Sequence, residues 1–290
     1  MSRRSVIASA RLIDLHTHST ASDGTTPPAR LVQEAQQAGL QVVALTDHDT
    51  TAGWAEAAGA LPAGLSLVRG CEVSCSREGI SLHLLAYLFD PLEPTFAAAR
   101  QQLRDSRIGR AQRMVAMIAG DGHDVSWEQV QGLAGGTVGR PHVAQALLAA
   151  GLVDTISAAF SPDWLGTHGR YWVGKHELDV VEAVGLVRAA GGVAVFAHPG
   201  AVKRGRTVGD DVIADMAAAG LTGLEVDHID HDEDEKTHLR GLADELGLLT
   251  TGSSDFHGTN KTVQLGAFTT SPEAYDKIVG SATGLPVLTR

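Results

Sequence analysis

Residues 41–50 read QVVALTDHDT, a short apolar run that ends directly in acidic and imidazole side chains. Such a run is typical of a buried strand. The same arrangement occurs in RLIDLHTH at residues 11–18. Between them lies a predicted helix, Ala29–Ala38, which opens beside prolines and closes at Gly39. A strand, a helix and a strand in this order predict parallel strands joined by a right-handed crossover.

This alternation continues along most of the chain and predicts an α/β fold. The number of strands, about seven, favours a closed (β/α) barrel over an open sheet. Further strands are expected at Ser66–Val73, Ile80–Leu88, Val193–Ala197, Gly223–Val226, Leu248–Thr251 and Leu265–Phe268, and further helices at Ala52–Gly59, Leu178–Ala190, Asp211–Ala219, Glu233–Leu246 and Pro272–Val279.

The alternation is interrupted between residues 95 and 175. Thr95–Gly120 predicts one long helix rich in Ala, Arg and Gln, and no strand is expected before Gly192. We therefore predict a small helical domain, residues 95–175, inserted into a barrel formed by residues 1–94 and 176–290. Within the insertion, short helices are expected at Trp127–Leu133, Pro141–Ala150 and Asp154–Phe160.

The composition of the 290 residues limits the classes of function. With 23 Lys and Arg against 34 Asp and Glu, the net charge of −11 argues against broad binding to a nucleic-acid backbone. No apolar run has the length of a membrane helix, and the apolar stretch within residues 1–10 is too short for an export signal. Two cysteines, Cys71 and Cys75, are too few for a disulfide framework and are expected in the core. We expect a cytoplasmic protein with no membrane partner and no obligate protein partner.

Imidazoles and carboxylates stand where the predicted strands end. The carboxyl ends of parallel barrel strands meet at one mouth, so these side chains are expected to converge there. In His-X-His on an extended segment, both rings point the same way, because side chains alternate with period two. His83 lies within its strand and fits this pattern less well. The residues at strand ends are His16 and His18, then Asp47, His48 and Asp49, then Glu72, then His198, and last Asp255 and His257.

A cluster of imidazoles and carboxylates without thiolate suits Zn, Mn, Fe or Co, and Mn or Mg more as the carboxylate content rises. The candidate ligands are too many for one ion, and a carboxylate such as Glu72 can bridge two. The sequence therefore predicts a centre of two or three metals, an arrangement typical of phosphoester hydrolysis. Asp47 and Asp49 are expected to orient the neighbouring histidines.

Several motifs together resemble the PHP (polymerase and histidinol phosphatase) family over nearly the whole chain outside the insertion. The resemblance implies a distorted barrel with a trinuclear metal site. The motifs are His16-Thr17-His18, Ser22-Asp23-Gly24-Thr25, Thr46-Asp47-His48-Asp49-Thr50, Phe196-Ala197-His198-Pro199 and Gly252-Ser253-Ser254-Asp255-Phe256-His257-Gly258.

The family pattern also implies how the metal ligands are shared. By that pattern one ion is held by His16, His18, Glu72 and Asp255, a second by Glu72, His83 and His198, and a third by Asp23, His48 and His257. Mn is the expected metal, with Zn, Fe or Mg as alternatives.

Within the family, the short spacing from Glu72 to His83 and the helical insertion resemble the 3′,5′-nucleoside bisphosphate phosphatases. The insertion's motifs at residues 139–142 (GRPH) and 171–175 (YWVGK) also fit that subgroup. The resemblance implies removal of the 3′-phosphate from adenosine 3′,5′-bisphosphate, giving AMP. Related members shorten small oligonucleotides from the 5′ end, so the expected partners are a small nucleotide and short oligonucleotides.

The hypothesis for the mechanism is hydrolysis of a phosphomonoester by a hydroxide that bridges two metals. His198 or a metal-bound water is the candidate donor of a proton to the leaving ribose oxygen. Residues 203–206 (KRGR) follow His198 in one loop, which would place a basic patch beside the metals. The predicted substrate contacts are Arg140, His142, Lys175, Arg204 and Arg206, since arginine forks match phosphate oxygens.

Three other functions stay open. These are a histidinol phosphate phosphatase, a 5′-to-3′ exonuclease for short oligonucleotides, and a degenerate metal-binding module without catalysis. The acidic run at residues 227–235 (DHIDHDEDE) is expected as a solvated loop that leads into a helix, with His228 or His231 touching substrate as the alternative. Structural or exposed positions are expected for His123, His168, His176 and His238.

Overall fold

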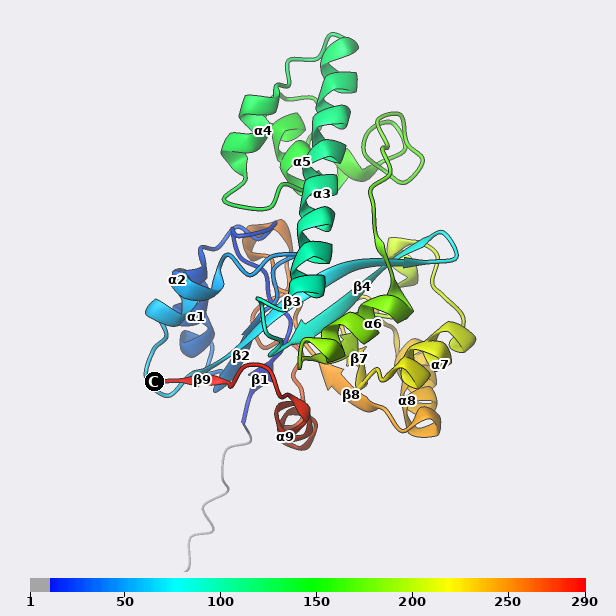
Figure 1. The fold of residues 1–290 in the computed structure, drawn as a ribbon. Helices are drawn as coiled ribbons and strands as arrows, with labels where there is room; N and C mark the ends of the chain where they lie inside the picture. The colour runs from blue at the N-terminus through cyan, green and yellow to red at the C-terminus, as the bar shows by residue number, and fades with distance from the viewer. Residues whose placement is uncertain (1–10) are drawn as a thin grey trace, which may run out of the picture.

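Seven strands form a sheet that curls into a nearly closed barrel in a computed structural model, which describes residues 11–290 (Figure 1). The first and last strands of this path meet beyond their ends, where the amide of His18 donates to the carbonyl of Phe256 at 2.8 Å. The predicted α/β barrel is therefore confirmed. Residues 1–10, on which the expectation about export rests, lie outside the described residues. The strand order is β1 (Ile13–Asp14), β2 (Val42–Leu45), β3 (Ser66–Arg77), β4 (Ile80–Tyr87), β6 (Val193–Phe196), β7 (Gly223–Asp227) and β8 (Leu249–Gly252).

The expectation that all strands run parallel is wrong for β4. Only Glu78 and Gly79 connect β3 to β4, both with positive φ (54° and 71°), so the two strands form a tight antiparallel hairpin. β4 also pairs antiparallel with β6. Because β4 runs in reverse, His83 near its start lies opposite Ser74 near the end of β3. This direction brings His83 to the mouth where the other strands end.

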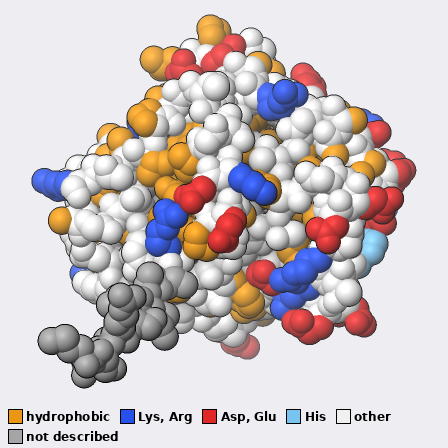
Figure 2. Space-filling view, turned by 90° about the horizontal axis from the view of Figure 1, so that it is seen from below, with side chains coloured by type: hydrophobic (Ala, Val, Ile, Leu, Met, Phe, Trp, Pro, Cys, Tyr) orange, Lys and Arg blue, Asp and Glu red, His pale blue; other side chains and the backbone are white. Residues whose placement is uncertain are grey.

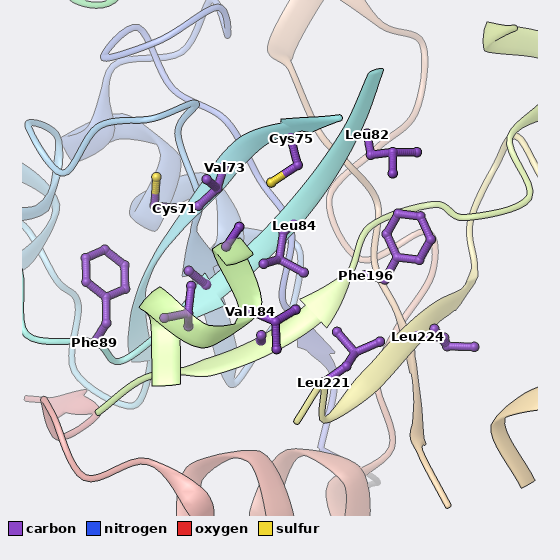
Figure 3. Packing of buried hydrophobic residues seen from close by; sticks show 14 of the residues in the cluster. Cys71, Val73, Cys75, Leu82, Leu84, Phe89, Val184, Phe196, Leu221 and Leu224 are labelled. Atoms are coloured by element: carbon purple, nitrogen blue, oxygen red, sulfur yellow. The ribbon is translucent and has the colours of Figure 1, made fainter. Parts of the chain in front are cut away.

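Helices cover the outside of the barrel, and apolar side chains fill the layer between (Figure 3). Cys71 and Cys75 are free, buried thiols in this layer, as expected (Figure 3). A second cluster that includes Leu15, Leu85 and Val195 fills the barrel interior. The covering helices are α1 (Pro28–Gln37), α2 (Trp54–Gly59), α6 (Val180–Ala189), α7 (Asp210–Ala219), α8 (Glu233–Leu246) and α9 (Pro272–Ser281).

Some short elements differ from those predicted from sequence. Leu265–Phe268 is a turn and not a strand, and its amide groups help to hold the barrel, since Gly266 donates to buried Asp14 at 2.9 Å. Two brief strands that pair with β3 were not predicted, β5 (Leu178–Asp179) and β9 (Leu288–Thr289). Within residues 11–290, no helix is both long and apolar enough to cross a bilayer.

The segment between β4 and β5 is helical and extends away from the barrel (Figure 1). Its own apolar cluster includes Met114, Leu147 and Tyr171. Only Ala158–Phe160 of the third predicted short helix is helical, as one 3₁₀ turn. The exact boundaries of an inserted domain, residues 95–175, remain a prediction. The helices are α3 (Pro94–Gly120), α4 (Trp127–Leu133) and α5 (Arg140–Ala149).

The insertion packs closely on the loop that follows β1. The amide of Thr137 donates to the carbonyl of Ala21 at 2.9 Å. At Gly136 a Cβ would stand 2.3 Å from that same carbonyl oxygen, so any larger residue would push the insertion away. Since this loop carries Asp23, the contact fixes the insertion beside the barrel mouth.

Candidate metal centre

The nine predicted metal ligands come together at the barrel mouth. They supply six imidazoles and three carboxylates from six different strands and the loops that follow them. In each of three overlapping groups, the donor atoms lie within 4.8 Å of one another, as a shared metal ion requires. The groups are His18, Asp23, His48 and His257; His16, His18 and Glu72; and His48, Glu72 and His83.

Glu72 lies between these groups and uses its two oxygens in different directions. Its Oε1 lies 2.8 Å from His83 Nδ1 and 3.1 Å from His198 Nε2. Its Oε2 lies 3.0 Å from His18 Nε2 and 3.2 Å from His48 Nδ1. This placement agrees with the expectation that Glu72 bridges two ions. The assignment of each ligand to a particular ion remains a prediction.

Asp255 also has two distinct oxygens. Its Oδ1 faces three imidazoles, with His16 Nε2 at 3.4 Å and His257 Nδ1 at 3.3 Å. Its Oδ2 accepts hydrogen bonds from Lys261 Nζ at 2.5 Å and Arg204 Nη2 at 2.7 Å. Burial alone would raise the pKa of Asp255, but the charge of Lys261 and its other cationic neighbours holds it well below the usual range. Asp255 is therefore an anion whose free oxygen points at the histidines.

The protonation states favour metal binding by two of the histidines. Burial, and then the charge of Arg204, lowers the pKa of His198 to about 3. Burial, and then the charge of Lys261, lowers the pKa of His257 to about 4. Both rings are neutral at pH 7, as metal ligands must be. A neutral His198 lacks the acidic imidazolium proton that a proton donor uses, so this ring suits a ligand better than the proton donor considered from sequence.

His48 provides a direct test of whether the site fits a metal. Its Nδ1 is buried and, although Glu72 Oε2 lies 3.2 Å away, it makes no hydrogen bond within the described residues. A buried polar atom normally has such a partner. His16 and His18 likewise bring their Nε2 atoms to 3.0 Å of each other. Divalent cations held among these side chains would satisfy such lone pairs, and nitrogen with carboxylate oxygen suits Mn, Zn or Fe. The donor set therefore fits metal ions, while their identity is open.

Asp47 and Asp49 do not contact histidines as the sequence analysis expected. Asp47 accepts hydrogen bonds from the side chains of Ser19 and Ser22, and Ser22 Oγ lies 3.4 Å from His18 Nδ1. Asp47 thus acts on His18 only through a serine. Asp49 accepts hydrogen bonds from the amide and hydroxyl of Ser74 at 2.7 and 2.8 Å, and it ties the loop of His48 to β3.

Glu225 on β7 is a site residue that the sequence analysis missed. It is fully buried, and its two oxygens accept from His16 Nδ1 and from the amide of His198, both at 2.9 Å. Burial would raise the pKa of Glu225, but His16 and two further histidines lower it to about 2. With Nδ1–H donated to Glu225, the Nε2 of His16 is left free for a metal.

The variant Glu225→Gln is expected to weaken metal binding by about 10- to 100-fold, because carboxylates that orient a ligand histidine contribute on this order. The amide keeps the size of the side chain but loses the charge that fixes the His16 tautomer. The measurement is the metal concentration that gives half-maximal occupancy, by calorimetry. Asp227→Asn, two residues along on the same strand and paired with Arg240 outside the mouth, is the matched control and should bind metal normally. Equal metal affinity in the two variants would contradict the role of Glu225.

The metal cluster opens into a cavity of about 1080 Å³ between the barrel and the insertion. Among the predicted substrate contacts, Arg140, Lys175 and Arg204 line it. His142 does not, because it is buried with Nδ1 accepting from the amide of Gly139 at 2.9 Å. Arg206 is exposed and does not line the cavity. The structure therefore does not bring these two side chains to the cavity.

Other residues near the mouth were not predicted to be there. Arg107, Arg110 and Lys261 line the cavity. His168 is exposed, as expected, and also lines the cavity. His228 is fully buried with Nε2 3.3 Å from Asp255 Oδ2, and His231 is also buried. The acidic second half of the run at residues 227–235 leads into a helix as expected, since Asp232 and Glu235 form a capping box at the start of α8.

Known proteins resemble this chain in sequence and in fold. The family model of the PHP domain matches residues 14–151. The 3′,5′-nucleoside bisphosphate phosphatase of Chromobacterium violaceum is 34% identical, over 84% of this chain and 87% of that protein. A 5′-3′ exoribonuclease of Haemophilus influenzae is also 34% identical, over 87% of this chain and 92% of that protein. The crystal structure of a protein from Bifidobacterium adolescentis, described as a metal-dependent phosphoesterase, superposes with a TM-score of 0.89 at 36% identity, covering 95% of this chain and 98% of that one.

Proposed function

Because the chain belongs to the PHP family of metal-dependent phosphoesterases, we propose that it is a phosphomonoester hydrolase that removes the 3′-phosphate from 3′,5′-nucleoside bisphosphates. The preferred substrate in this proposal is adenosine 3′,5′-bisphosphate, with AMP and phosphate as products. The first-named relative carries this activity in its name, and it aligns over most of both chains.

The observation that carries the proposal is the charge of the cavity. Seven lysines and arginines line it against three carboxylates, in a chain whose net charge is −11. Such a local concentration of positive charge attracts a small polyanion. Aromatic side chains of Phe160, His168 and Trp172 also line the cavity and offer a surface for a nucleobase. The cationic side chains are Arg107, Arg110, Arg140, Lys175, Lys203, Arg204 and Lys261.

The chain's own residues would divide the work of hydrolysis. The nine ligand side chains would hold divalent ions, which lower the pKa of coordinated water and neutralise charge on a phosphate. Arg204 is oriented by two carboxylates, with Nε 2.6 Å from Asp230 and Nη2 2.7 Å from Asp255. Its position in the cavity wall puts a guanidinium where negative charge develops on the phosphate oxygens. Hydrolysis places the water oxygen on phosphorus and a proton on the ribose oxygen that leaves.

A second candidate is the exonuclease that shortens small oligonucleotides from the 5′ end. The cavity volume, about 1080 Å³, exceeds what one nucleotide needs, and a relative is named as an exoribonuclease. On the face opposite the insertion, Lys and Arg are interspersed with Asp and Glu rather than gathered into a groove (Figure 2). Among the described residues, that face therefore carries no extended basic groove.

The remaining alternatives are less compatible with the site. Histidinol phosphate carries one phosphate and a cationic amine. The seven basic side chains of the cavity would repel that amine. A degenerate binding module would be expected to have lost ligands, yet six imidazoles and three carboxylates are all in place at the mouth.

The test is a substrate panel with metal analysis on the same sample. The protein loaded with Mn²⁺ is expected to release phosphate from adenosine 3′,5′-bisphosphate, leaving AMP rather than adenosine 3′-monophosphate. Chelation should abolish the release and added Mn²⁺ should restore it. The panel also contains histidinol phosphate and short 5′-phosphorylated oligonucleotides. Full metal loading without release from the bisphosphate would refute the proposal, and faster cleavage of the oligonucleotides would establish the exonuclease instead.

A further inference from the structure

Arg110 on α3 is a buried cation without a partner. It is only 6% exposed, yet its Nε has no hydrogen bond and the guanidinium makes no ion pair within residues 11–290. An arginine stays protonated in proteins, so the side chain cannot avoid the penalty of burial by losing its proton. Arg110 lines the cavity, which leaves that space as the place from which a partner can come.

Basic side chains around Arg110 increase the excess of positive charge at this position. Arg107 on the same helix and Arg140 on α5 are its nearest cationic neighbours, and burial together with these two charges holds the pKa of Arg110 well below its usual range. Lys175 arrives from the segment before β5 and is also buried. Three separate parts of the chain therefore bring positive charge to one wall of the cavity.

Two of the three basic side chains around Arg110 already have polar partners. Arg107 donates to Asp49 and to Ser74, at 2.5 and 2.6 Å. Lys175 is paired with Glu177 at 2.6 Å. Arg140 has only a carbonyl at 3.4 Å and the ring of Phe160, 5.6 Å from its guanidinium carbon. The unmatched charge is thus concentrated on Arg110 and Arg140.

We propose that Arg110 and Arg140, supported by Lys175, form an anion-binding site on the inserted helices that takes a phosphate monoester dianion. The site is separate from the metal ligands, all of which come from the barrel strands and their loops. Resting on the proposed function, it would take the 5′-phosphate of the bisphosphate while the 3′-phosphate lies at the metals. A paired guanidinium fork matches phosphate geometry, and a dianion would neutralise the two unmatched charges.

The experiment compares Arg110→Gln with Arg113→Gln, an exposed arginine one turn further along the same helix that does not line the cavity. For adenosine 3′,5′-bisphosphate, Arg110→Gln is expected to raise KM by about 10- to 100-fold, the loss typical of a charged hydrogen bond. For adenosine 3′-monophosphate, which lacks the second phosphate, KM should change by less than about twofold. Arg110→Lys should recover part of the loss, and Arg113→Gln should match the wild type with both substrates.

Calorimetry with AMP and with adenosine tests the site without turnover. Wild-type protein is expected to bind AMP more tightly than adenosine, and Arg110→Gln should reduce this preference by about 10- to 100-fold. The Tm of Arg110→Gln without ligand should equal or exceed that of the wild type, because the substitution removes an unpaired buried charge. A lower Tm, or an equal loss for both substrates, would indicate a structural role and overturn the inference.

The two proposals fail in different ways. If the bisphosphate is hydrolysed but Arg110→Gln behaves like Arg113→Gln, the anion site is wrong and the proposed function stands. If no bisphosphate is hydrolysed but AMP binding depends on Arg110, the proposed function is wrong and the anion site stands.

Discussion

Glu72→Gln is expected to lower kcat/KM for the preferred substrate by about a thousandfold, the scale seen when one electrostatic component of a transition-state site is removed. Both oxygens of Glu72 are committed, one toward His83 and His198 and the other toward His18 and His48. An amide has one oxygen and no charge, so it cannot serve both directions. Burial would raise the pKa of Glu72, but His83 and the other histidines hold it well below the usual range, so the lost group is an anion at any working pH.

The loss should be accompanied by a loss of metal. Elemental analysis of Glu72→Gln is expected to find at least one ion fewer per chain than in the wild type, while the far-ultraviolet circular dichroism stays the same. Glu182→Gln, an exposed carboxylate on α6, is the matched control and should keep both metal and activity. Unchanged turnover and metal content in Glu72→Gln would show that Glu72 is not a metal ligand. That result would contradict the interpretation of this site as a metal centre bridged by Glu72.

The convergence of the candidate metal ligands could be predicted because a simple geometric rule connects sequence to position. A residue that directly follows a parallel strand lies at the carboxyl edge of the sheet, whatever the rest of the fold does. Asp255 and His257 after β8 obey this rule, as do His16 and His18 after β1. The rule fits less well for Glu72 and His83, which lie within β3 and β4, and Asp23 was assigned from the family resemblance. The two-residue connection at Glu78 and Gly79 was the signal that the strand of His83 runs in reverse.

The supporting residues were harder to predict because their burial depends on tertiary packing. Glu225 stands inside an apolar strand, where a lone carboxylate is unexpected unless it is paired. In α3 the buried residues Leu103, Arg107, Arg110 and Met114 recur at helical spacing, so two arginines lie within an apolar stripe. That stripe is visible in the sequence, but only the docking of α3 against the mouth shows what these arginines face. His142 and Arg206 were assigned to substrate from motif and loop position, and neither property determines the direction of a side chain.

Arg107→Met is expected to lower the Tm by on the order of 10 °C, the largest effect on stability that we predict. Arg107 and Asp49 are both buried, with side-chain exposures of 6% and 0%, and Arg107 Nε donates to Asp49 Oδ2 at 2.5 Å. Removing the guanidinium leaves a buried carboxylate without its cation, which typically costs about 3–5 kcal/mol. The same contact joins helix α3 of the insertion to the loop of His48, so the loss falls on the attachment of the insertion to the barrel.

The double variant Arg107→Met/Asp49→Asn distinguishes loss of the ion pair from loss of packing. Asparagine tolerates the positive φ of 58° at this position and is neutral, so the double variant should be more stable than Arg107→Met alone.

The pH dependence of stability follows from the same ion pair. Burial would raise the pKa of Asp49, but Arg107 and other cations lower it to about 2. The ion pair therefore stabilises the fold fully at pH values above the unfolded pKa of roughly 3.9. This contribution to stability disappears as the pH falls toward 2. The deficit of Arg107→Met, measured by thermal unfolding in chelator, should therefore be largest at neutral pH and shrink in acid. A deficit that is independent of pH and equal in the double variant would assign the effect to packing of the arginine stem instead of its charge.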